Sequence, residues 1–445
     1  MKNKHFLIVT LGCFKNEVES DNMRCALEEI GLTETGDLKS ADIVVVNTCG
    51  FIADACDEGI DTILELDALK SEVEDVPPIL AVGCMVQRYG VDLIKEMPEI
   101  SGVLGTDWQG HLAVAVSELL LGSRYSVPPG PPRPSALRRH IDSSDNATLF
   151  VRVADGCDRG CRFCSIPSIK GPFISRPPED ICEEVKRLSN GRDREVILLA
   201  QDLTSYGLDN GSSVTELAKR LTDIPEVRWL RLLYLQPEGV TPRLIEEIAG
   251  NPRICDYFDI PFQHASVPVL RAMGRPGGAE AFMDLVGSIR ERIPDAAIRS
   301  TVMVGYPGET EEDFETLLEF ITEARFDWLG AFVFSPEEGT TSISLPGAID
   351  FDVAVSRYNM VAEAQDRIEE SGLAKFEGHR LEVVIDSFSE IGPYEYVGRS
   401  YREAPVVDGI INLCQDGDRL VPVEPGRFLE ALITGREGLD LVGEI

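Results

Sequence analysis

The chain has 445 residues, 43% of them hydrophobic, and a formal net charge of −34. It is long enough for about three domains and too acidic for a broad phosphate-binding surface, so nucleic-acid binding is disfavoured. No apolar run approaches the roughly 18 residues of a membrane span, and the short apolar start is read as a strand, not a signal peptide.

Eleven cysteines are an odd number in a long chain. They argue against a disulfide framework and for reduced thiols or metal ligands, and therefore for a cytoplasmic protein. The acidity fits either a proteome adapted to salt or a basic protein partner. We expect the chain to act as a monomer.

Residues 1–125 alternate apolar runs with helical patterns. The runs HFLIVTLGC, ADIVVVNTC and PPILAVGC are rich in Val, Ile and Leu, as in buried parallel strands. Helical stretches such as NEVESDNMRCALEEIG separate them. A βαβ series of this kind predicts an open, Rossmann-like α/β domain.

Each of these three runs ends on a cysteine, namely Cys13, Cys49 and Cys84. The carboxyl ends of neighbouring parallel strands meet at one edge of a sheet, where ligands bind. Strand-end cysteines are often small core residues, but three at equivalent ends favour a metal-cluster site. Lys15 and Asn16 follow Cys13 and are expected to shape its pocket, although Asn16 could instead cap a helix.

Residues 126–146 carry five prolines in their first ten positions and predict a stiff linker. From 147 to 372 the alternation resumes, with six strands predicted in TLFVRVADG, EVILLAQDL, WLRLLYLQ, YFDIPFQH, IRSTVMVGYPG and WLGAFVFS. Six units are too few for a closed eight-fold barrel. They predict a partial (β/α)6, TIM-like barrel with its functional groups at the carboxyl ends of the strands.

Residues 376–445 have a different pattern, with short strands broken by Gly, Pro and Asp. The predicted strands are RLEVVIDSF, EYVGRSY, GIINL, DRLVPVE and FLEALITGR. This spacing predicts a small antiparallel β-barrel of the OB-like kind.

Three cysteines, Cys157, Cys161 and Cys164, lie within eight positions with the spacing C-x3-C-x2-C. Thiolates bind soft metal centres, and iron–sulfur cubes usually take four cysteines. Three would leave one iron open to a substrate. Structural zinc needs a fourth ligand, and the nearest histidine, His140, precedes the first barrel strand. Zinc and three buried bystanders remain the alternatives.

This spacing, with the aromatic Phe163 just before the last cysteine, resembles the radical S-adenosylmethionine (SAM) family. The resemblance implies a [4Fe-4S] cluster whose open iron chelates SAM. One-electron cleavage would then yield a 5′-deoxyadenosyl radical, which can remove hydrogen from an unactivated carbon. The six strand–helix units agree with that family's partial barrel.

Two three-cysteine sites in one chain, an α/β domain first and a small barrel last, resemble the methylthiotransferases over essentially the whole chain. The last part resembles their TRAM domain. The resemblance implies a second [4Fe-4S] cluster on Cys13, Cys49 and Cys84 that supplies or holds the inserted sulfur. SAM would be both methyl donor and radical source, with an external electron donor and a sulfur donor as further partners.

Within that family, several strings resemble the RimO branch, which methylthiolates the β-carbon of an aspartate in protein twelve of the small ribosomal subunit. They are TLGCFKNEVESD, CSIPSIKG, LLAQDLTSYG, DIPFQHAS and VGRSYREAPVVDG. The branch that modifies a transfer-RNA adenosine more typically shows GCQMN, CVVPYTRG and a QS pair where Gln263 and His264 stand. Phe14 and Asp158 depart from the usual Pro and Asn, and neither change removes a ligand.

The charge of the last domain bears on the substrate. Residues 376–445 hold more than twice as many acidic residues as arginines and no lysine. A barrel that binds transfer RNA should be basic, whereas an acidic one can steer a basic ribosomal protein. The alternatives are a transfer-RNA substrate and, from another class, an iron–sulfur carrier or electron-transfer protein.

Polar residues near the ends of the barrel strands predict the SAM pocket. With Phe163 they are Gln201, Asp202, Tyr206, Gln263, His264, Arg299, Ser300, Gly305 and Glu309. The glycines of GYPGE serve equally well as turn formers, and His264 as a structural histidine. Arg275 is placed near the substrate. The remaining cysteines are predicted to be small buried residues; they are Cys25, Cys56, Cys182, Cys255 and Cys414.

Overall fold

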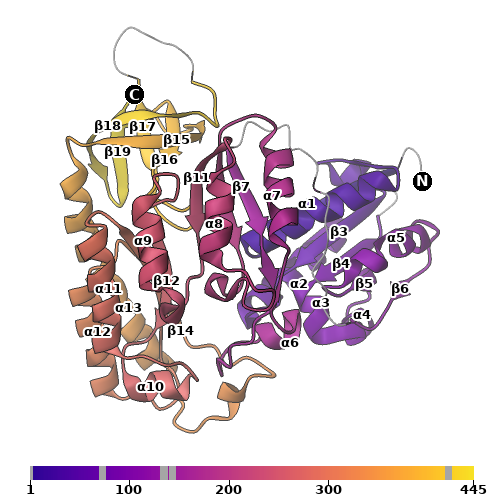
Figure 1. Cartoon of the computed structure of the whole chain (residues 1–445). Coiled ribbons are helices and arrows are strands. Elements are labelled where there is room, and N and C mark those ends of the chain that lie inside the picture. Colours follow the sequence, from indigo (N-terminus) through magenta and orange to yellow (C-terminus); the bar gives the residue numbers. More distant parts are fainter. Residues whose placement is uncertain (1–3, 70–76, 131–138, 140–146, 416–422) are drawn as a thin grey trace.

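The computed structural model describes residues 4–69, 77–130, 139, 147–415 and 423–445. Along the chain it builds an α/β sheet, then a central set of strand–helix units, then a small β-barrel (Figure 1). Most of the predicted linker, residues 126–146, falls outside the described residues. Within the described parts, no helix has the length and apolar character needed to cross a membrane.

The first part is a six-stranded parallel sheet with the strand order β2-β1-β3-β4-β5-β6. Its strands are β1 (Lys4–Thr10), β2 (Leu32–Glu34), β3 (Ile43–Thr48), β4 (Ile79–Gly83), β5 (Ile100–Leu104) and β6 (Tyr125–Ser126). Its helices are α1 (Phe14–Glu29), α2 (Ala53–Ala68), α3 (Cys84–Tyr89), α4 (Leu93–Glu96) and α5 (Leu112–Leu120). The three predicted strands are therefore confirmed as β1, β3 and β4; the short β2 and the strands β5 and β6 were not anticipated.

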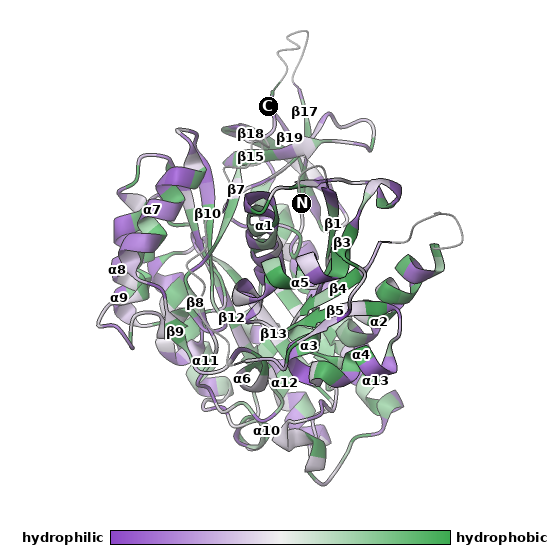
Figure 2. Ribbon diagram, turned by 90° about the vertical axis from the view of Figure 1, so that its right-hand side faces the viewer, coloured by the Kyte–Doolittle hydropathy of each residue, from purple (hydrophilic) through white to green (hydrophobic). Residues whose placement is uncertain are grey.

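Both faces of this sheet are covered, which explains its unbroken apolar runs. In β3, Val45 packs into the core shared with α1 and α5. Its neighbours Val44 and Val46 pack into the core on the other face, with residues of α2, α3 and α4. Figure 2 shows the resulting hydrophobic strands β1, β3 and β4 in the interior.

The central part contains the six predicted parallel strands. They are β7 (Thr148–Arg152), β10 (Arg194–Leu199), β11 (Val227–Leu232), β12 (Tyr257–Gln263), β13 (Ala297–Val304) and β14 (Trp328–Val333). They form two three-stranded halves, β11-β10-β7 and β12-β13-β14. The halves join where Leu230 pairs with Ile254 and where the Leu235 amide donates to the Asp259 carbonyl at 2.8 Å. The expected partial barrel is thereby confirmed.

Amphipathic helices cover the outer face of this barrel. They are α7 (Pro178–Ser189), α8 (Val214–Thr222), α9 (Pro242–Gly250), α11 (Ala279–Arg292), α12 (Glu311–Ala324) and α13 (Phe351–Leu373). In β10, Val196 and Leu198 belong to the outer core with these helices, whereas Ile197 and Leu199 belong to the inner core. A strand that is buried on both sides again reads as a continuous apolar run.

Helix α1 of the first part packs on the inner face of the barrel. The ring of Phe14 stacks on Phe150 of β7, with centroids 4.5 Å apart and planes 15° apart. Val18, one turn further along α1, is buried in the same inner core. The phenylalanine that departs from the family's usual proline is therefore an interface residue.

The last part is a closed five-stranded barrel in the order β15-β16-β17-β19-β18. Its strands are β15 (Arg380–Phe388), β16 (Tyr396–Arg399), β17 (Ile411–Cys414), β18 (Phe428–Glu437) and β19 (Asp440–Glu444). Four pairs are antiparallel, but β17 and β19 are parallel. The predicted strand DRLVPVE falls mainly on residues 416–422, which lie outside the described residues, and β19 is a strand that the sequence analysis missed.

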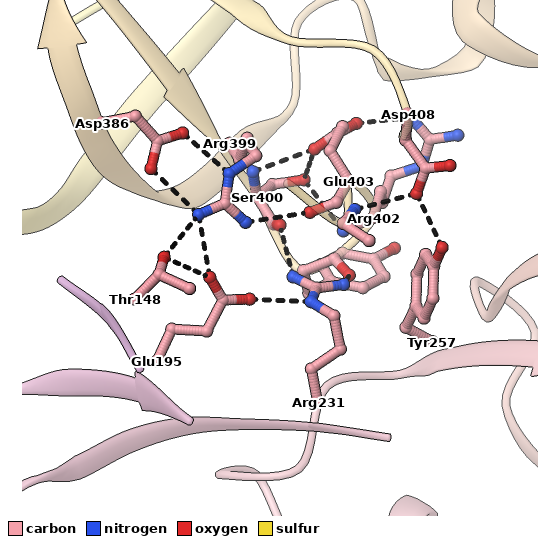
Figure 3. Close-up of polar contacts among 12 residues, drawn as sticks. Thr148, Glu195, Arg231, Tyr257, Asp386, Arg399, Ser400, Arg402, Glu403 and Asp408 are labelled. Carbon is pink, nitrogen blue, oxygen red and sulfur yellow. Dashed lines mark hydrogen bonds and ion pairs between the residues drawn. The ribbon is translucent and has the colours of Figure 1, made fainter. Parts of the chain in front are cut away.

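The loop that follows β16 fills the amino-terminal end of the central barrel (Figure 3). Glu195 of β10 accepts from Arg231 Nε at 2.7 Å and pairs with Arg399 Nη2 at 2.8 Å. Arg399 also pairs with Asp386 at 2.7 Å. All three members of the Glu195–Arg231–Arg399 cluster are almost fully buried, so they stabilise the interface only as a complete set.

The same loop makes further contacts with the first residues of the neighbouring strands. The Tyr257 hydroxyl donates to Asp408 at 2.6 Å, Arg299 Nε donates to the same carboxylate at 3.1 Å, and the Trp328 indole donates to the Arg402 carbonyl at 2.8 Å. The string VGRSYREAPVVDG is therefore a structural plug that closes the barrel at the end opposite to the predicted active site.

Replacing Glu195 by Gln removes the charge partner of the buried Arg231 guanidinium and leaves Arg399 with Asp386 alone. We expect the free energy of unfolding to fall by about 3–5 kcal/mol, measured by denaturant titration of the full chain. The control is Glu363→Gln on α13, whose ion pair with Arg367 is exposed and contributes only about 0.3–0.5 kcal/mol. Equal losses in the two variants would contradict the role given to the plug.

The same cluster predicts an acid-sensitive interface. Burial alone would raise the pKa of Glu195, but Arg399 and Arg231 outweigh it and lower the pKa to about 2. A carboxylate with a lowered pKa stabilises the fold above its unfolded pKa, and this contribution is lost as the pH falls toward the folded value. Between about pH 4.5 and pH 2 the natural chain should therefore lose more unfolding free energy than Glu195→Gln, in denaturant titrations at a series of pH values. Parallel curves of unfolding free energy against pH for the two chains would refute this prediction.

Candidate functional site

The structure brings the three distant cysteines to one edge of the first sheet. Cys13 is the N-cap residue of α1, Cys49 directly follows β3, and Cys84 is the first residue of α3, directly after β4. Because β1, β3 and β4 are neighbours in the sheet, their carboxyl ends lie side by side. The three thiols come from three separate loops at that edge.

Small and polar neighbours hold these loops close together. Gly12 has φ +91°, and a Cβ there would lie 2.7 Å from the Cβ of Cys49. The Asn16 amide donates to the Leu11 carbonyl at 2.6 Å and to the Thr48 carbonyl at 3.3 Å. Asn16 therefore joins the Cys13 and Cys49 loops, and the helix-cap alternative is wrong because Cys13 is the N-cap residue.

Lys15 points toward the barrel. Its Nζ lies 3.7 Å from the centroid of the Tyr234 ring, beyond the carboxyl end of β11. A buried ammonium over an aromatic face is a favourable contact. Lys15 thus belongs to the contact between the two parts of the chain.

The buried thiol of this edge is protonated in the absence of a metal. Burial raises the pKa of Cys84 to about 11; Lys170 opposes this rise, and Cys49 and Cys13 add to it. A metal centre that binds Cys84 must therefore displace its proton.

The three close cysteines lie on a loop between β8 (Ala154–Asp155) and α6 (Ile166–Lys170). β8 pairs with β9 (Ile174–Ser175) and closes the base of this loop. Asp158, at the position where the family usually has Asn, accepts from the Phe173 amide at 3.0 Å. Burial, with smaller contributions from Cys161 and Cys157, raises the pKa of Cys164 to about 12, and Arg275 opposes this.

Charged side chains anchor the same loop to the barrel. Arg159 Nε donates to Asp202 at 2.5 Å, and Arg275 Nη1 lies 3.8 Å from Cys161 Sγ. The Arg162 amide donates to the Met273 carbonyl at 2.9 Å. Arg275 was expected near the substrate; the structure places it beside a cysteine.

The two cysteine regions are adjacent. Ser165, next to Cys164, donates its hydroxyl to the carbonyl of Phe51, two residues after Cys49, at 2.8 Å. The Thr106 hydroxyl lies 3.5 Å from the Ile169 carbonyl of α6. Both Figure 1 and Figure 2 place α3 and α6 next to each other. Neither Ser165 nor Phe51 belongs to a recognisable sequence pattern; the only signal in the sequence is that each lies within two residues of a cysteine.

Several of the predicted SAM residues have structural contacts. The buried Asp202 accepts from Arg159, Thr204 and Ser205. The Tyr206 hydroxyl, in the hydrophobic core, donates to the Arg176 carbonyl at 2.9 Å. Their assignment to the SAM pocket stays a prediction. In the structure Asp202 contacts the cysteine loop through Arg159, and Tyr206 packs in the core.

Arg299 and Ser300 lie in the first half of β13 and not at its carboxyl end. Arg299 pairs with Asp259 of the neighbouring strand β12 and with Asp408 of the plug. The Ser300 hydroxyl donates to the Ile260 carbonyl at 2.8 Å, where the β12–β13 register shifts. The expected position of both residues at the strand end is wrong, because β13 extends to Val304.

The other predicted residues do follow strand ends. Gln263, half-buried with φ +70°, ends β12, and the half-buried Gln201 follows β10. His264 is fully buried; its Nδ1 accepts from the Ser266 amide, and its Nε2 lies 3.7 Å from Glu309.

Glu309 and Phe163 also have protein partners. Glu309 accepts from the Gly305 amide at 2.9 Å and pairs with Arg357 at 2.6 Å. Phe163 packs against a small core that includes Met273 and Tyr306. Within the described part of the chain, the side chains of Gln201 and Gln263 have no hydrogen-bond partner, so these two residues are the better candidates for ligand contact.

The bystander cysteines are mostly buried, as predicted. Cys25, Cys56, Cys182 and Cys255 are buried, but Cys414 is partly exposed, so that prediction is wrong for Cys414. Among the described residues, no group of three or more His, Cys, Asp or Glu side chains is placed to hold a single metal ion. An iron–sulfur cube differs from a single ion, because each cysteine binds a different iron.

The close approach at Gly12 predicts a difference between two glycines with the same backbone conformation. Gly12→Ala and Gly31→Ala both place a side chain at φ near +90°, which costs about 1–2 kcal/mol. Only Gly12→Ala meets Cys49, since nothing lies within 4 Å of a Cβ at Gly31. We expect it to lose about 1–3 kcal/mol more unfolding free energy in denaturant titrations. Equal losses would show that the cysteine edge accommodates a methyl group.

Family models match the three parts of the chain. The Radical SAM superfamily matches residues 151–321, the TRAM domain matches residues 378–445, and a family described as "Uncharacterized protein family UPF0004" matches residues 5–105. The closed five-stranded barrel is consistent with the TRAM match.

Solved structures support the fold alone. The radical S-adenosylmethionine methyltransferase TsrM from Kitasatospora setae has a TM-score of 0.57 at 14% sequence identity, over 77% of this chain and 74% of that one.

Curated relatives match over nearly the full length. Ribosomal protein uS12 methylthiotransferase RimO from Moorella thermoacetica is 40% identical over 98% of both chains. RimO from Thermotoga maritima is 38% identical over 98% of this chain and 99% of that one, and RimO from Geobacter sulfurreducens is 37% identical over 98% of both. The chain therefore belongs to the RimO family of methylthiotransferases and is a radical SAM enzyme.

Proposed function

We propose that this chain adds a methylthio group to the β-carbon of an aspartate in ribosomal protein uS12. The observation that carries the proposal is the hydrogen bond from Ser165 to Phe51, which places the two cysteine regions against each other. Radical formation and sulfur insertion on one carbon require two centres that share a cavity. The printed names of the full-length relatives support uS12 as the substrate.

The residues present fit two [4Fe-4S] clusters and SAM. Each region offers three thiols, which are ligands for iron–sulfur clusters. Cys157, Cys161 and Cys164 would hold one cluster, and Cys13, Cys49 and Cys84 the other. When bound, the first cluster would pass one electron from an external donor to SAM and supply a 5′-deoxyadenosyl radical, and the second would supply or hold the sulfur.

The chain's own residues orient these ligands. Arg275 places a positive charge 3.8 Å from Cys161 Sγ, where it would attract the negative charge of a bound cluster. Arg159, paired with Asp202 and Glu238, fixes the loop between Cys157 and Cys161 to the barrel. Gln201 and Gln263, at strand ends, would contact SAM or the substrate.

Surface charge favours a basic protein over transfer RNA as the substrate. Some TRAM-domain acids, such as Glu403 and Asp408, are buried in the plug and cannot attract a partner. Others remain exposed; they are Glu377, Glu390, Glu395, Glu424, Glu430, Glu437 and Glu444. An acidic surface repels polyanions and attracts a basic partner.

The test combines the product with two cysteine variants. Anaerobically reconstituted chain, given SAM, a chemical reductant and uS12, should yield deoxyadenosine together with uS12 heavier by one methylthio group, detected by mass spectrometry. Cys157→Ala should abolish both products. Cys13→Ala should keep deoxyadenosine but lose the methylthio group. Cys414→Ala, in the TRAM domain, is the control and should retain both.

Comparison of strains separates the candidate substrates. Without the gene, uS12 should lose the modification while transfer-RNA adenosines are unchanged. Loss from transfer RNA would replace the proposed substrate by the alternative one. Full turnover by Cys157→Ala would refute the radical site, and absence of deoxyadenosine from the natural chain would favour a cluster carrier.

A further inference from the structure

A segment after the last barrel strand contacts both cysteine regions. Residues 335–345 leave the end of β14. The Ser342 amide donates to the Arg162 carbonyl at 3.0 Å, inside the loop of the three close cysteines. At its other end, Glu337 contacts the loop after Cys49. This segment therefore lies against both sites at once, and the sequence analysis did not identify it.

The Glu337 carboxylate has a partner for each oxygen. Oε1 accepts from the Ala53 amide at 2.9 Å and from the Ser335 hydroxyl at 2.7 Å. Oε2 pairs with Arg88 Nη1 at 2.9 Å. Only 3% of the Glu337 side chain is exposed. Because Ala53 begins the 16-residue helix α2, the carboxylate also lies at the positive end of a helix.

Arg88 extends these contacts on the cysteine edge. It lies one turn after Cys84 on α3, and its guanidinium donates to the carbonyls of Gly50 and Glu338 at 3.2 Å. Gly50 directly follows Cys49. The Glu337–Arg88 pair thus connects the elements that carry Cys49 and Cys84 to the chain that contacts Arg162.

We propose that Glu337 is a positioning residue that fixes the spacing between the two cysteine triplets. The proposal rests on the proposed function, because the spacing matters only if both sites act on one carbon. Transfer between two centres depends steeply on geometry, and a displacement of about 1 Å can cost about 100-fold in rate. If the sheet edge that carries Cys13, Cys49 and Cys84 moved away from the barrel, SAM cleavage would continue. The fraction of radicals that lead to product would fall.

The test compares two neighbouring glutamates in the full-length, cluster-loaded chain. Glu337→Gln keeps the shape but removes the charge that pairs with Arg88; Glu338→Gln alters an exposed side chain. With iron content matched, we expect Glu337→Gln to form deoxyadenosine within about twofold of the natural rate while methylthiolated uS12 per deoxyadenosine falls about tenfold or more. Glu338→Gln should keep the natural ratio. An unchanged ratio in Glu337→Gln overturns the proposal.

A second readout does not depend on activity. Hydrogen exchange followed by mass spectrometry should show faster exchange in residues 50–56 and 84–90 of Glu337→Gln, and not of Glu338→Gln. Unchanged exchange would show that the contacts of Glu337 with Ala53 and Arg88 do not hold these two segments in place. If the natural chain makes no methylthiolated product, the proposed function fails. The exchange result still decides whether Glu337 stabilises the segments next to Cys49 and Cys84.

Arg88→Met provides the complementary variant. If the pair acts as a unit, the effect of the double variant Arg88→Met/Glu337→Gln on product ratio and exchange should be smaller than the sum of the two single effects. Strictly additive effects would mean that the two side chains act separately, which contradicts the proposal that the Glu337–Arg88 pair positions the cysteines. Retention of iron by each variant distinguishes a shifted edge from a lost cluster.

Discussion

Parallel strands place the residues that follow them at a single edge, and this constraint acts twice in the chain. In the α/β sheet it gathers Cys13, Cys49 and Cys84 from three separate loops. In the barrel it sets the C-x3-C-x2-C loop and the strand-end glutamines at one rim. The two edges then meet through Ser165 and Phe51, so the two groups of cysteines lie in adjacent parts of the structure.

The opposite end of the barrel has a different requirement. A partial barrel exposes the beginnings of its strands, and here buried Glu195 would have Arg231 as a charge partner and Arg299 would have Asp259. The TRAM loop adds a second charge partner to each, Arg399 for Glu195 and Asp408 for Arg299. The TRAM domain therefore contributes to stability through its buried charges and offers only its remaining exposed acids to a partner. The net charge of the domain overstates the charge that a substrate meets.

The contacts between the parts of the chain are chemically mixed. Phe14 on Phe150 and Lys15 over Tyr234 join α1 to the barrel, and the Glu337–Arg88 pair joins the loop after β14 to the cysteine edge. Each contact is unremarkable in the sequence, where its partners lie more than 100 residues apart. Sequence patterns report local periodicity, and they contain no signal for pairs of this kind.

The sequence by itself determined most of the strands and the class of each part, because burial on both faces leaves continuous apolar runs. It also marked six cysteines, whose role as cluster ligands stays a prediction. Strands β2 and β6 were not predicted because they are very short. Strands β5 and β19 were not predicted because glycine and polar residues interrupt their apolar positions. Only the tertiary structure decided that Arg299 and Ser300 lie away from the strand ends, that Tyr206 and His264 are fully buried, and that VGRSYREAPVVDG is a plug. Those roles depend on what packs against a residue in space, and the order of residues along the chain does not encode that in any local pattern.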